Sequence, residues 1–301
     1  MRSHLRMHEQ KSFYKYMTFD TALAVLENCS LRWSSPLIFN DPFDVPREVM
    51  SNVTSDKISK SLVKLIINEL KNPRRDLDEL HSNIKNMIIQ FKTMFPQGIP
   101  EELMDKFDSI MGNPPIGDGA EQSIDDFKII WESMIKRMRI LCLTINPAIT
   151  SMWNHYADHY SGVVLEFSCN DELDSAWLIA EPIIYSNDLP HTYSADGMAH
   201  LLFHNEKKSI KYLAHEITYL KTKDWSTEQE WRISTYDSVS SDNLFSDLKF
   251  HPLELKSVIL GPNFKNENFD KLLELLVKYK HTVIKTAEIT AQRNIAINVK
   301  V

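Results

Sequence analysis

The sequence predicts an α+β fold in which short strands accompany a block of helices. Runs such as ILCLTI and GVVLEFS are short, apolar and rich in β-branched residues, as is typical of buried strands. At about residues 55–140, by contrast, apolar residues recur at i, i+3 and i+4, which is typical of amphipathic helices. Because no low-complexity linker or internal repeat divides the 301 residues, we expect a single domain, 1–301, with a helical insertion at about 55–140.

The first elements are expected close to the N-terminus. SFYKYMT is a short aromatic run that predicts a strand, and in FDTALAVLEN the side chains of Phe19, Leu23 and Leu26 fit one face of a helix. LRWSSP and LIFNDPFDVP follow. Their Asn-Asp-Pro step predicts a turn, because Pro42 keeps Asp41 out of the α region.

The C-terminal part of the chain predicts a strand–helix–strand unit. LKSVILG reads as a strand that ends in a glycine turn, NENFDKLLELLVKY as an amphipathic helix and HTVIKTAEI as a closing strand. This order is typical of one βαβ unit. Upstream, EWRISTY predicts a strand, TSMWNHYADHY the start of a helix, and SIKYLAHEITYLKT either a helix or a strand.

The composition disfavours several classes of protein. A net charge of −7 disfavours non-specific binding to nucleic acid or to an anionic membrane, although a local basic groove would still allow a nucleic-acid-modifying enzyme. Seven glycines and the absence of G-x-G-x-x-G and G-x-x-x-x-G-K disfavour Rossmann and P-loop folds. Three separated cysteines, no signal peptide and no apolar run of about 18 residues predict a cytoplasmic protein without a membrane partner.

The first candidate site is the segment from Trp153 to Tyr160. If the helix continued through it, His155 and His159 would lie one turn apart on one face, and so would Tyr156 and Tyr160. A zinc site of the H-E-x-x-H type needs Glu directly after the first histidine, and Tyr156 occupies that place. We therefore expect no metal; a polar helix face with aromatic anchors is the structural alternative.

The second candidate site is the pair Glu228 and Glu230, flanked by Trp225 and Trp231 and followed by Arg232; the two tryptophans suggest a partly desolvated cleft. In an extended segment both carboxylates would lie on one face and raise each other's pKa, which suits a general base or the stabilisation of a cation. Arg232 would lie on the same face and hold one carboxylate ionised. From spacing alone, a surface strand with a salt bridge is the favoured alternative.

The third candidate site combines Tyr14, Lys15 and Tyr16 with Asn40 and Asp41 of FNDPFD. Asn and Asp in a tight turn are usually structural, because their side chains bond the nearby backbone. Taken alone, this group is therefore interpreted as structural.

Together these motifs resemble a bacterial family. The chain has Tyr14-Lys15-Tyr16 near the start, then LRWSSPLIFNDPFD, ILCLT, MWNHYADHYSGVVLEF and EQEWRI, in the order found in the domain of unknown function 2971 (DUF2971). The resemblance spans the chain except the helical block. Members of that family often lie in mobile or phage-defence gene neighbourhoods, which implies a toxin or abortive-infection role with antiviral effect.

A more distant similarity is to ADP-ribosyltransferases, whose fold is a split mixed sheet. Their order of an early strand, a middle aromatic segment and a late strand with catalytic Glu is similar to Tyr14–Tyr16, then Trp153 and Tyr156, then Glu228 and Glu230. The resemblance implies NAD as the substrate cofactor. Lys15 or Tyr16 stands here where those enzymes carry His or Arg.

The resemblance also implies roles for single residues. Glu230 would hydrogen-bond a ribose hydroxyl and stabilise the oxocarbenium-like state, and Glu228 would orient or deprotonate the acceptor. Tyr156 or Trp153 would stack on nicotinamide, and Lys15 would approach a phosphate or ribose.

Three functions follow as hypotheses. The first is a defence-associated effector, working alone or with a defence-system partner protein, that cleaves NAD and transfers ADP-ribose to a nucleic-acid or protein acceptor, or hydrolyses NAD. The second is a nuclease-like toxin directed at RNA or DNA. It would use His155, His159 and Glu230 and a basic groove around Lys207, Lys208 and Lys211. The third is a non-enzymatic module that senses a nucleotide or a phage protein.

Overall fold

The computed structural model describes residues 2–46, 53–72, 76–100, 102–103, 106, 119–237 and 243–299. Contacts between Cα atoms divide the chain into two compact units. The first comprises residues 1–44, 135–185 and 221–301, and the second comprises residues 45–134 and 186–220. The second unit therefore contains the expected helical block together with a later segment that the sequence pattern did not assign to it.

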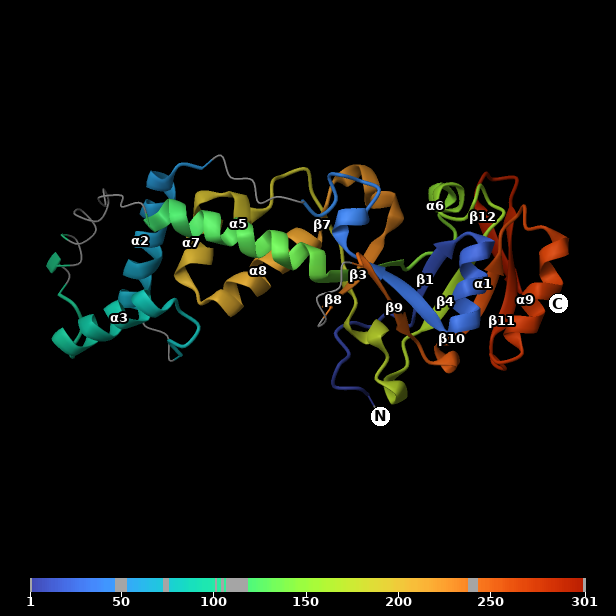
Figure 1. The fold of residues 1–301 in the computed structure, drawn as a ribbon, viewed down its shortest axis with the longest axis horizontal. Helices are drawn as coiled ribbons and strands as arrows, with labels where there is room; N and C mark the ends of the chain where they lie inside the picture. Colours follow the sequence, from blue (N-terminus) through green and yellow to red (C-terminus); the bar gives the residue numbers. More distant parts are fainter. Residues whose placement is uncertain are drawn as a thin grey trace. The chain divides into compact units, whose positions relative to one another are not determined.

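The main sheet belongs to the first unit and has ten strands in the described part of the chain (Figure 1). They are β1 (Ser12–Met17), β2 (Ser30–Ser34), β3 (Met138–Thr144), β4 (Val163–Ser168), β5 (Glu181–Pro182), β8 (Glu230–Tyr236), β9 (Phe245–Lys249), β10 (Leu255–Leu260), β11 (Val283–Ile289) and β12 (Ile295–Val299). β10 and β11 are parallel and the other pairs are antiparallel, so the sheet is mixed. The predicted α+β class with a mixed sheet is confirmed.

The sheet branches at β3. One path has the order β12-β11-β10-β4-β1-β3-β2-β9, and β8 pairs with β3 outside this path. Because β8 pairs along all of Met138–Thr144, β1 and β2 share the opposite edge of β3. β1 meets that edge where Tyr14 faces Thr144, and β2 meets it where Ser34 faces Ile140. Between these two points the edge of β3 is open to side chains from both strands.

The two faces of the sheet pack against different helices. Along β4, alternate side chains point to opposite faces, as the pleat requires. Leu165 joins the main core with Leu26 of α1 (Phe19–Asn28) and Leu272 of α9 (Phe269–Leu276). On the other face, Val164 packs in a smaller core with Tyr16 and with Trp153 of α6 (Thr150–His155). α1 begins and ends where FDTALAVLEN predicts.

The predicted βαβ unit is confirmed by β10, α9 and β11, because the two strands are parallel neighbours. Two further strands, β9 and β12, were not predicted; each lies at an end of the long strand path, where one edge lacks a neighbour in the described sheet. EWRISTY forms β8, as expected.

The second unit contains α2 (Ser55–Lys71), α3 (Ser82–Met94), most of α5 (Gly119–Arg137), α7 (Ala195–Phe203) and α8 (Glu206–Thr218). SIKYLAHEITYLKT is mostly helical, because it supplies most of α8. The short strands β6 (Ile184–Tyr185) and β7 (Leu220–Lys221) form a separate two-stranded sheet. The core of the second unit contains Ile66, Leu80, Ile84, Ile88 and Phe203. Among the described helices, none is both long and apolar enough to cross a membrane.

Candidate functional site

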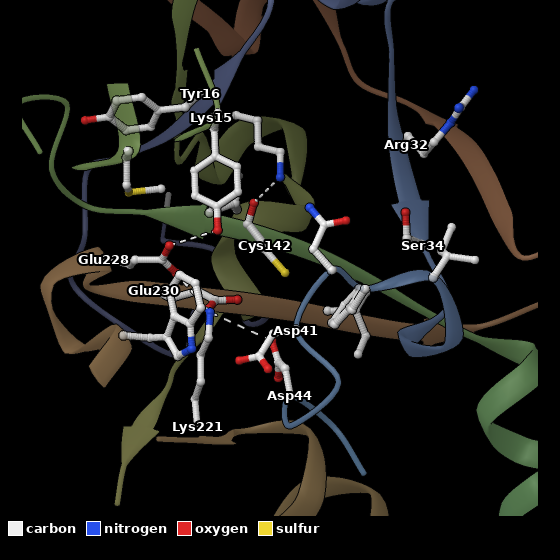
Figure 2. A pocket seen from close by; sticks show the side chains of 18 of the residues that line it. Lys15, Tyr16, Arg32, Ser34, Asp41, Asp44, Cys142, Lys221, Glu228 and Glu230 are labelled. Atoms are coloured by element: carbon white, nitrogen blue, oxygen red, sulfur yellow. Dashed lines mark hydrogen bonds and ion pairs between the residues drawn. The ribbon is translucent and has the colours of Figure 1, made fainter. Parts of the chain in front are cut away.

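A cavity of about 240 Å³ lies in the first unit, where β1 and β2 separate along the edge of β3 (Figure 2). Lys15 reaches across this gap, and its Nζ donates a hydrogen bond of 2.8 Å to the carbonyl oxygen of Cys142. The lining side chains come from the three strands, the turn after β2, α6 and the segment before β8. They are Tyr14, Lys15, Tyr16, Arg32, Ser34, Ile38, Phe39, Asn40, Asp41, Asp44, Ile140, Cys142, Leu143, Met152, Tyr156, Lys221, Trp225, Glu228 and Glu230.

Five charged residues form a buried cluster at this cavity, and each is at most 7% exposed. Lys221 Nζ donates to Glu228 Oε2 at 2.9 Å and to Glu230 Oε2 at 2.8 Å, and lies 3.8 Å from Asp44 Oδ2. Arg232 donates from Nε to Glu230 Oε1 at 2.7 Å and from Nη2 to Asp44 Oδ2 at 2.6 Å. We call Asp44, Lys221, Glu228, Glu230 and Arg232 the acidic cluster, since three carboxylates face two cations.

The two glutamates converge for a reason other than strand alternation. Glu228 ends a 3₁₀ helix, Lys223–Glu228, and Gln229 has a left-handed φ of 48°, so that Glu230 is the first residue of β8. The expected extended segment is therefore wrong at Glu228. A turn brings both carboxylates to the one ammonium group of Lys221.

The charges of the cluster hold one another ionised. Burial alone would raise the pKa of Glu230, but the charges and hydrogen bonds of Arg232 and Lys221 outweigh it and keep that pKa below its usual value. Burial would lower the pKa of Lys221, and the three carboxylates raise it instead. The prediction that the two glutamates raise each other's pKa is wrong for Glu230, because the cations dominate. The expected role of Arg232 in holding a carboxylate ionised agrees with this geometry.

Two tyrosines complete the surroundings of the glutamates. The hydroxyl of Tyr156 donates to Glu228 Oε1 at 2.9 Å, and the hydroxyl of Tyr185 accepts the backbone N–H of Glu230 at 2.8 Å. Burial raises the pKa of Tyr185 to about 12, so its hydroxyl stays protonated at neutral pH. Each carboxylate oxygen of both glutamates thus has one donor, and a carboxylate oxygen can accept a second.

Both cations of the acidic cluster lie close to aromatic rings. The ammonium of Lys221 lies 4.8 Å from the ring centre of Trp225, and the guanidinium of Arg232 lies 5.6 Å from that of Phe39. Tyr16 is structural at its tip, because its hydroxyl donates to the Asn146 carbonyl at 3.0 Å and accepts the Ile149 N–H at 3.0 Å. The cavity therefore combines flat apolar faces with cations and acceptors.

Nine of the residues singled out in the sequence line this cavity, namely Tyr14, Lys15, Tyr16, Asn40, Asp41, Tyr156, Trp225, Glu228 and Glu230. Arg232 lies just beneath them, fully buried. Trp153 is also fully buried and donates through its indole N–H to the Pro147 carbonyl, and Trp231 packs edge-on against His8. These two tryptophans have structural contacts and are not among the lining residues.

The histidine pair is not arranged as expected. α6 ends at His155, and Asp158, His159 and Tyr160 all have positive φ, so His155 and His159 do not share a helix face. Both histidines are exposed. Over the part of the chain that the structure describes, no three His, Cys, Asp or Glu side chains are placed to hold a metal ion.

Sequence reasoning missed two charged lining residues, Arg32 and Lys221, and assigned no role to Phe39 and Asp44 of FNDPFD. Asp44 ends the FNDPFD motif, Lys221 precedes the two glutamates by a few residues, and Arg32 belongs to β2. The sequence did contain a signal for Asp44, because FNDPFD has two aspartates, Asp41 and Asp44, in one short turn. None existed for Lys221, because a lysine beside a short strand is most often solvated.

Residues 152–233 match the family described as Protein of unknown function (DUF2971). The match confirms the resemblance drawn from MWNHYADHY and EQEWR, and it includes Tyr156 and four members of the acidic cluster. No curated protein and no solved structure matches the chain.

Proposed function

We propose that this chain, which carries the DUF2971 match, cleaves NAD in the cavity beside the acidic cluster and transfers the ADP-ribose to a macromolecule or to water. The observation that carries the proposal is the excess of carboxylates: Asp44, Glu228 and Glu230 face only two cations of the cluster, Lys221 and Arg232. A buried cluster with net negative charge stabilises positive charge that develops beside it.

The binding of a dinucleotide is supported by the lining. Aromatic faces at Tyr14, Phe39 and Trp225 suit the flat rings of nicotinamide or adenine. Lys15, from β1, suits the pyrophosphate, whereas Arg32 of β2 already pairs with Asp247 through Nε and Nη2. The branching of the sheet at β3 supports the finer hypothesis that the fold is a split sheet of the ADP-ribosyltransferase type.

The proposed reaction is a displacement at the anomeric carbon of the nicotinamide ribose. The glycosidic C–N bond breaks, and its electron pair moves to the nicotinamide nitrogen, which loses its positive charge. Glu230 stabilises the oxocarbenium-like state, since its carboxylate is held ionised. An acceptor hydroxyl or water bonds to the anomeric carbon as its proton passes to Glu228, whose Oε1 also accepts from Tyr156.

The alternative functions receive less support from the geometry. A nuclease-like toxin would need His155 and His159 near Glu230, and neither histidine lines the cavity. The lysines expected to form a basic groove all lie on α8; they are Lys207, Lys208 and Lys211. Lys208 is paired with Glu79. A non-enzymatic nucleotide-sensing module would use the same cavity, and the experiment below separates it from an enzyme.

The test is the NAD concentration in cells that express wild type, Glu230→Gln or a control, together with transfer of label from NAD in a lysate. Glu254→Gln is the control, because Glu254 is equally buried, caps a 3₁₀ helix and does not line the cavity. Thermal melting of each purified protein separates loss of activity from loss of fold.

We expect NAD loss or label transfer with wild type and with Glu254→Gln, and a decrease of at least 100-fold with folded Glu230→Gln. Unchanged NAD and no transferred label while the wild-type chain is toxic would contradict the proposal. Binding of NAD without either change would favour the sensing module.

A further inference from the structure

One oxygen of the acidic cluster lacks a partner. Asp44 is 6% exposed and lines the cavity, and its Oδ2 accepts from Arg232 at 2.6 Å. Its Oδ1 is buried and has no hydrogen-bond partner among the residues that the structure describes. Buried carboxylate oxygens are almost always satisfied, because an unpaired acceptor loses its hydration without compensation. Figure 2 shows Asp44 next to Asp41, on the cavity side that faces Lys221.

The backbone beside this carboxylate is strained. Val45 has a φ of 43°, which is rare for a β-branched residue, and its side chain is fully buried. The Asp44 N–H donates to the Asp41 carbonyl at 3.3 Å, which closes the turn ahead of it. Strain of this kind persists where the surrounding structure imposes it, and it concentrates at binding sites. The fold therefore holds Asp44 in place although the backbone conformation of Val45 and the unpaired Oδ1 both cost free energy.

The missing partner is a donor, and the surrounding groups restrict its kind. Lys221 Nζ already lies within 4 Å of a carboxylate oxygen of Asp44, Glu228 and Glu230, so the three acids present acceptors close together. A ligand with two donors on adjacent atoms would satisfy several of these acceptors at once. Vicinal hydroxyls do so without adding charge to the cluster.

We propose that Asp44 is a specificity-determining residue whose Oδ1 accepts a hydrogen bond from a ribose hydroxyl of the bound nucleotide. This inference rests on the proposed function, since it assigns the ribose of that substrate to one side of the cavity. It also makes a claim of its own: the site distinguishes ribose from deoxyribose through Asp44.

The experiment measures dissociation constants by calorimetry for NAD, adenosine, 2′-deoxyadenosine and 3′-deoxyadenosine. The proteins are wild type, Asp44→Asn and Asp237→Asn. Asp237→Asn is the matched control, because Asp237 also pairs with a buried arginine, Arg139, at 3.1 Å, but does not line the cavity. Both variants exchange an aspartate of a buried arginine pair for its amide, and melting curves report whether each stays folded.

For wild type and Asp237→Asn we expect one of the deoxynucleosides to bind about 10- to 100-fold more weakly than adenosine, as for a hydrogen bond to a charged acceptor. In Asp44→Asn this discrimination should fall to about 3-fold or less. A merely structural role would weaken all ligands equally and leave the ratio unchanged, which would overturn the inference. The wild-type ratio is informative even if Asp44→Asn does not fold.

The remaining outcomes separate the two proposals. If wild type binds adenosine with Asp44-dependent discrimination but neither binds nor cleaves NAD, the proposed function fails and the inference stands. If NAD binds and is cleaved but deoxyribose and ribose bind equally, the inference fails and the proposed function stands. If no ribonucleoside and no NAD binds at millimolar concentration, both are overturned.

Discussion

Two charge clusters of the sheet, each built around buried carboxylates, differ in how completely they are paired. In the second, Glu166 on β4 accepts from Lys285 at 2.7 Å, from Ser257 at 2.6 Å and is paired with Lys256 at 2.9 Å. That cluster has one carboxylate for two cations, and both of its carboxylate oxygens have partners. The acidic cluster has the opposite ratio and an oxygen without a partner.

The difference indicates different roles. A carboxylate with more cations than it needs is satisfied within the protein, so the Glu166 cluster is suited to joining β4, β10 and β11. A group of acids with fewer cations than carboxylates keeps acceptor capacity that a bound ligand can fill, as we propose for the acidic cluster. Four predictions test this contrast, starting with the largest effect.

Replacement of the central lysine should separate the two clusters most clearly. Lys221→Met leaves two buried glutamates without the ammonium that bridges them, and we expect the free energy of unfolding to fall by about 3–5 kcal/mol. Lys285→Met leaves Glu166 with Lys256 and Ser257, and should cost about 1 kcal/mol. Urea denaturation at pH 7 measures both. Equal losses would show that the acidic cluster does not depend on its bridging cation.

Acid should affect stability through the fully paired cluster. Burial would raise the pKa of Glu166, but its hydrogen bonds to Lys285, Ser257 and Lys256 lower it from 4.5 to about 2. A carboxyl group whose folded pKa is lowered stabilises the protein above its unfolded pKa, and this contribution is lost as pH falls through the folded value. The stability difference between wild type and Glu166→Gln should therefore shrink between about pH 4.5 and about pH 2. A difference that is constant over this range would contradict the assignment.

Removal of one hydroxyl gives a smaller effect. In Tyr156→Phe the donor to Glu228 is lost, and because that acceptor is charged we expect a loss of about 2 kcal/mol. Tyr279→Phe is the comparison outside the acidic cluster, since its hydroxyl donates to the neutral Leu26 carbonyl, and about 1 kcal/mol is expected. If Tyr279→Phe proved the more damaging in denaturant, Glu228 would not be a charged acceptor in the folded protein.

The smallest disturbance is chemical modification of a thiol at the cavity. Burial raises the pKa of Cys142 to about 12, so its thiolate is scarce at pH 8 and its reaction with a thiol reagent should be slower by on the order of 10³ than that of an unperturbed cysteine. Mass spectrometry of the folded and urea-unfolded protein would identify the modified residue. Rapid labelling of Cys142 in the folded chain would contradict the raised pKa, because it would require that the cavity stabilises the thiolate form.

Local patterns predicted much of the fold and part of the site. FDTALAVLEN, GVVLEFS and LKSVILG each form the element that their apolar spacing indicates, because burial of one face selects one period. β9 escaped detection because most of its residues are exposed, so its polar sequence lacks alternation. The prediction of a helix through His159 was wrong. Three successive residues with positive φ form a turn there, and the spacing of apolar residues does not indicate such a turn.

What the sequence by itself determined is the chemistry available: the α+β class, the aromatic run at Tyr14–Tyr16 and the two glutamates of EQEWR. Only the tertiary structure decided which groups meet. Asp44 joins the cluster from a distant point of the chain, and the 3₁₀ helix before Glu228 brings Lys221 back to both glutamates. Lys221 and Arg232 lower the pKa of Glu230, reversing the shift that like-charge repulsion alone predicts. The sign of that shift depends on how the 3₁₀ helix and the turn at Gln229 place these side chains, which the spacing of charges in the sequence does not encode.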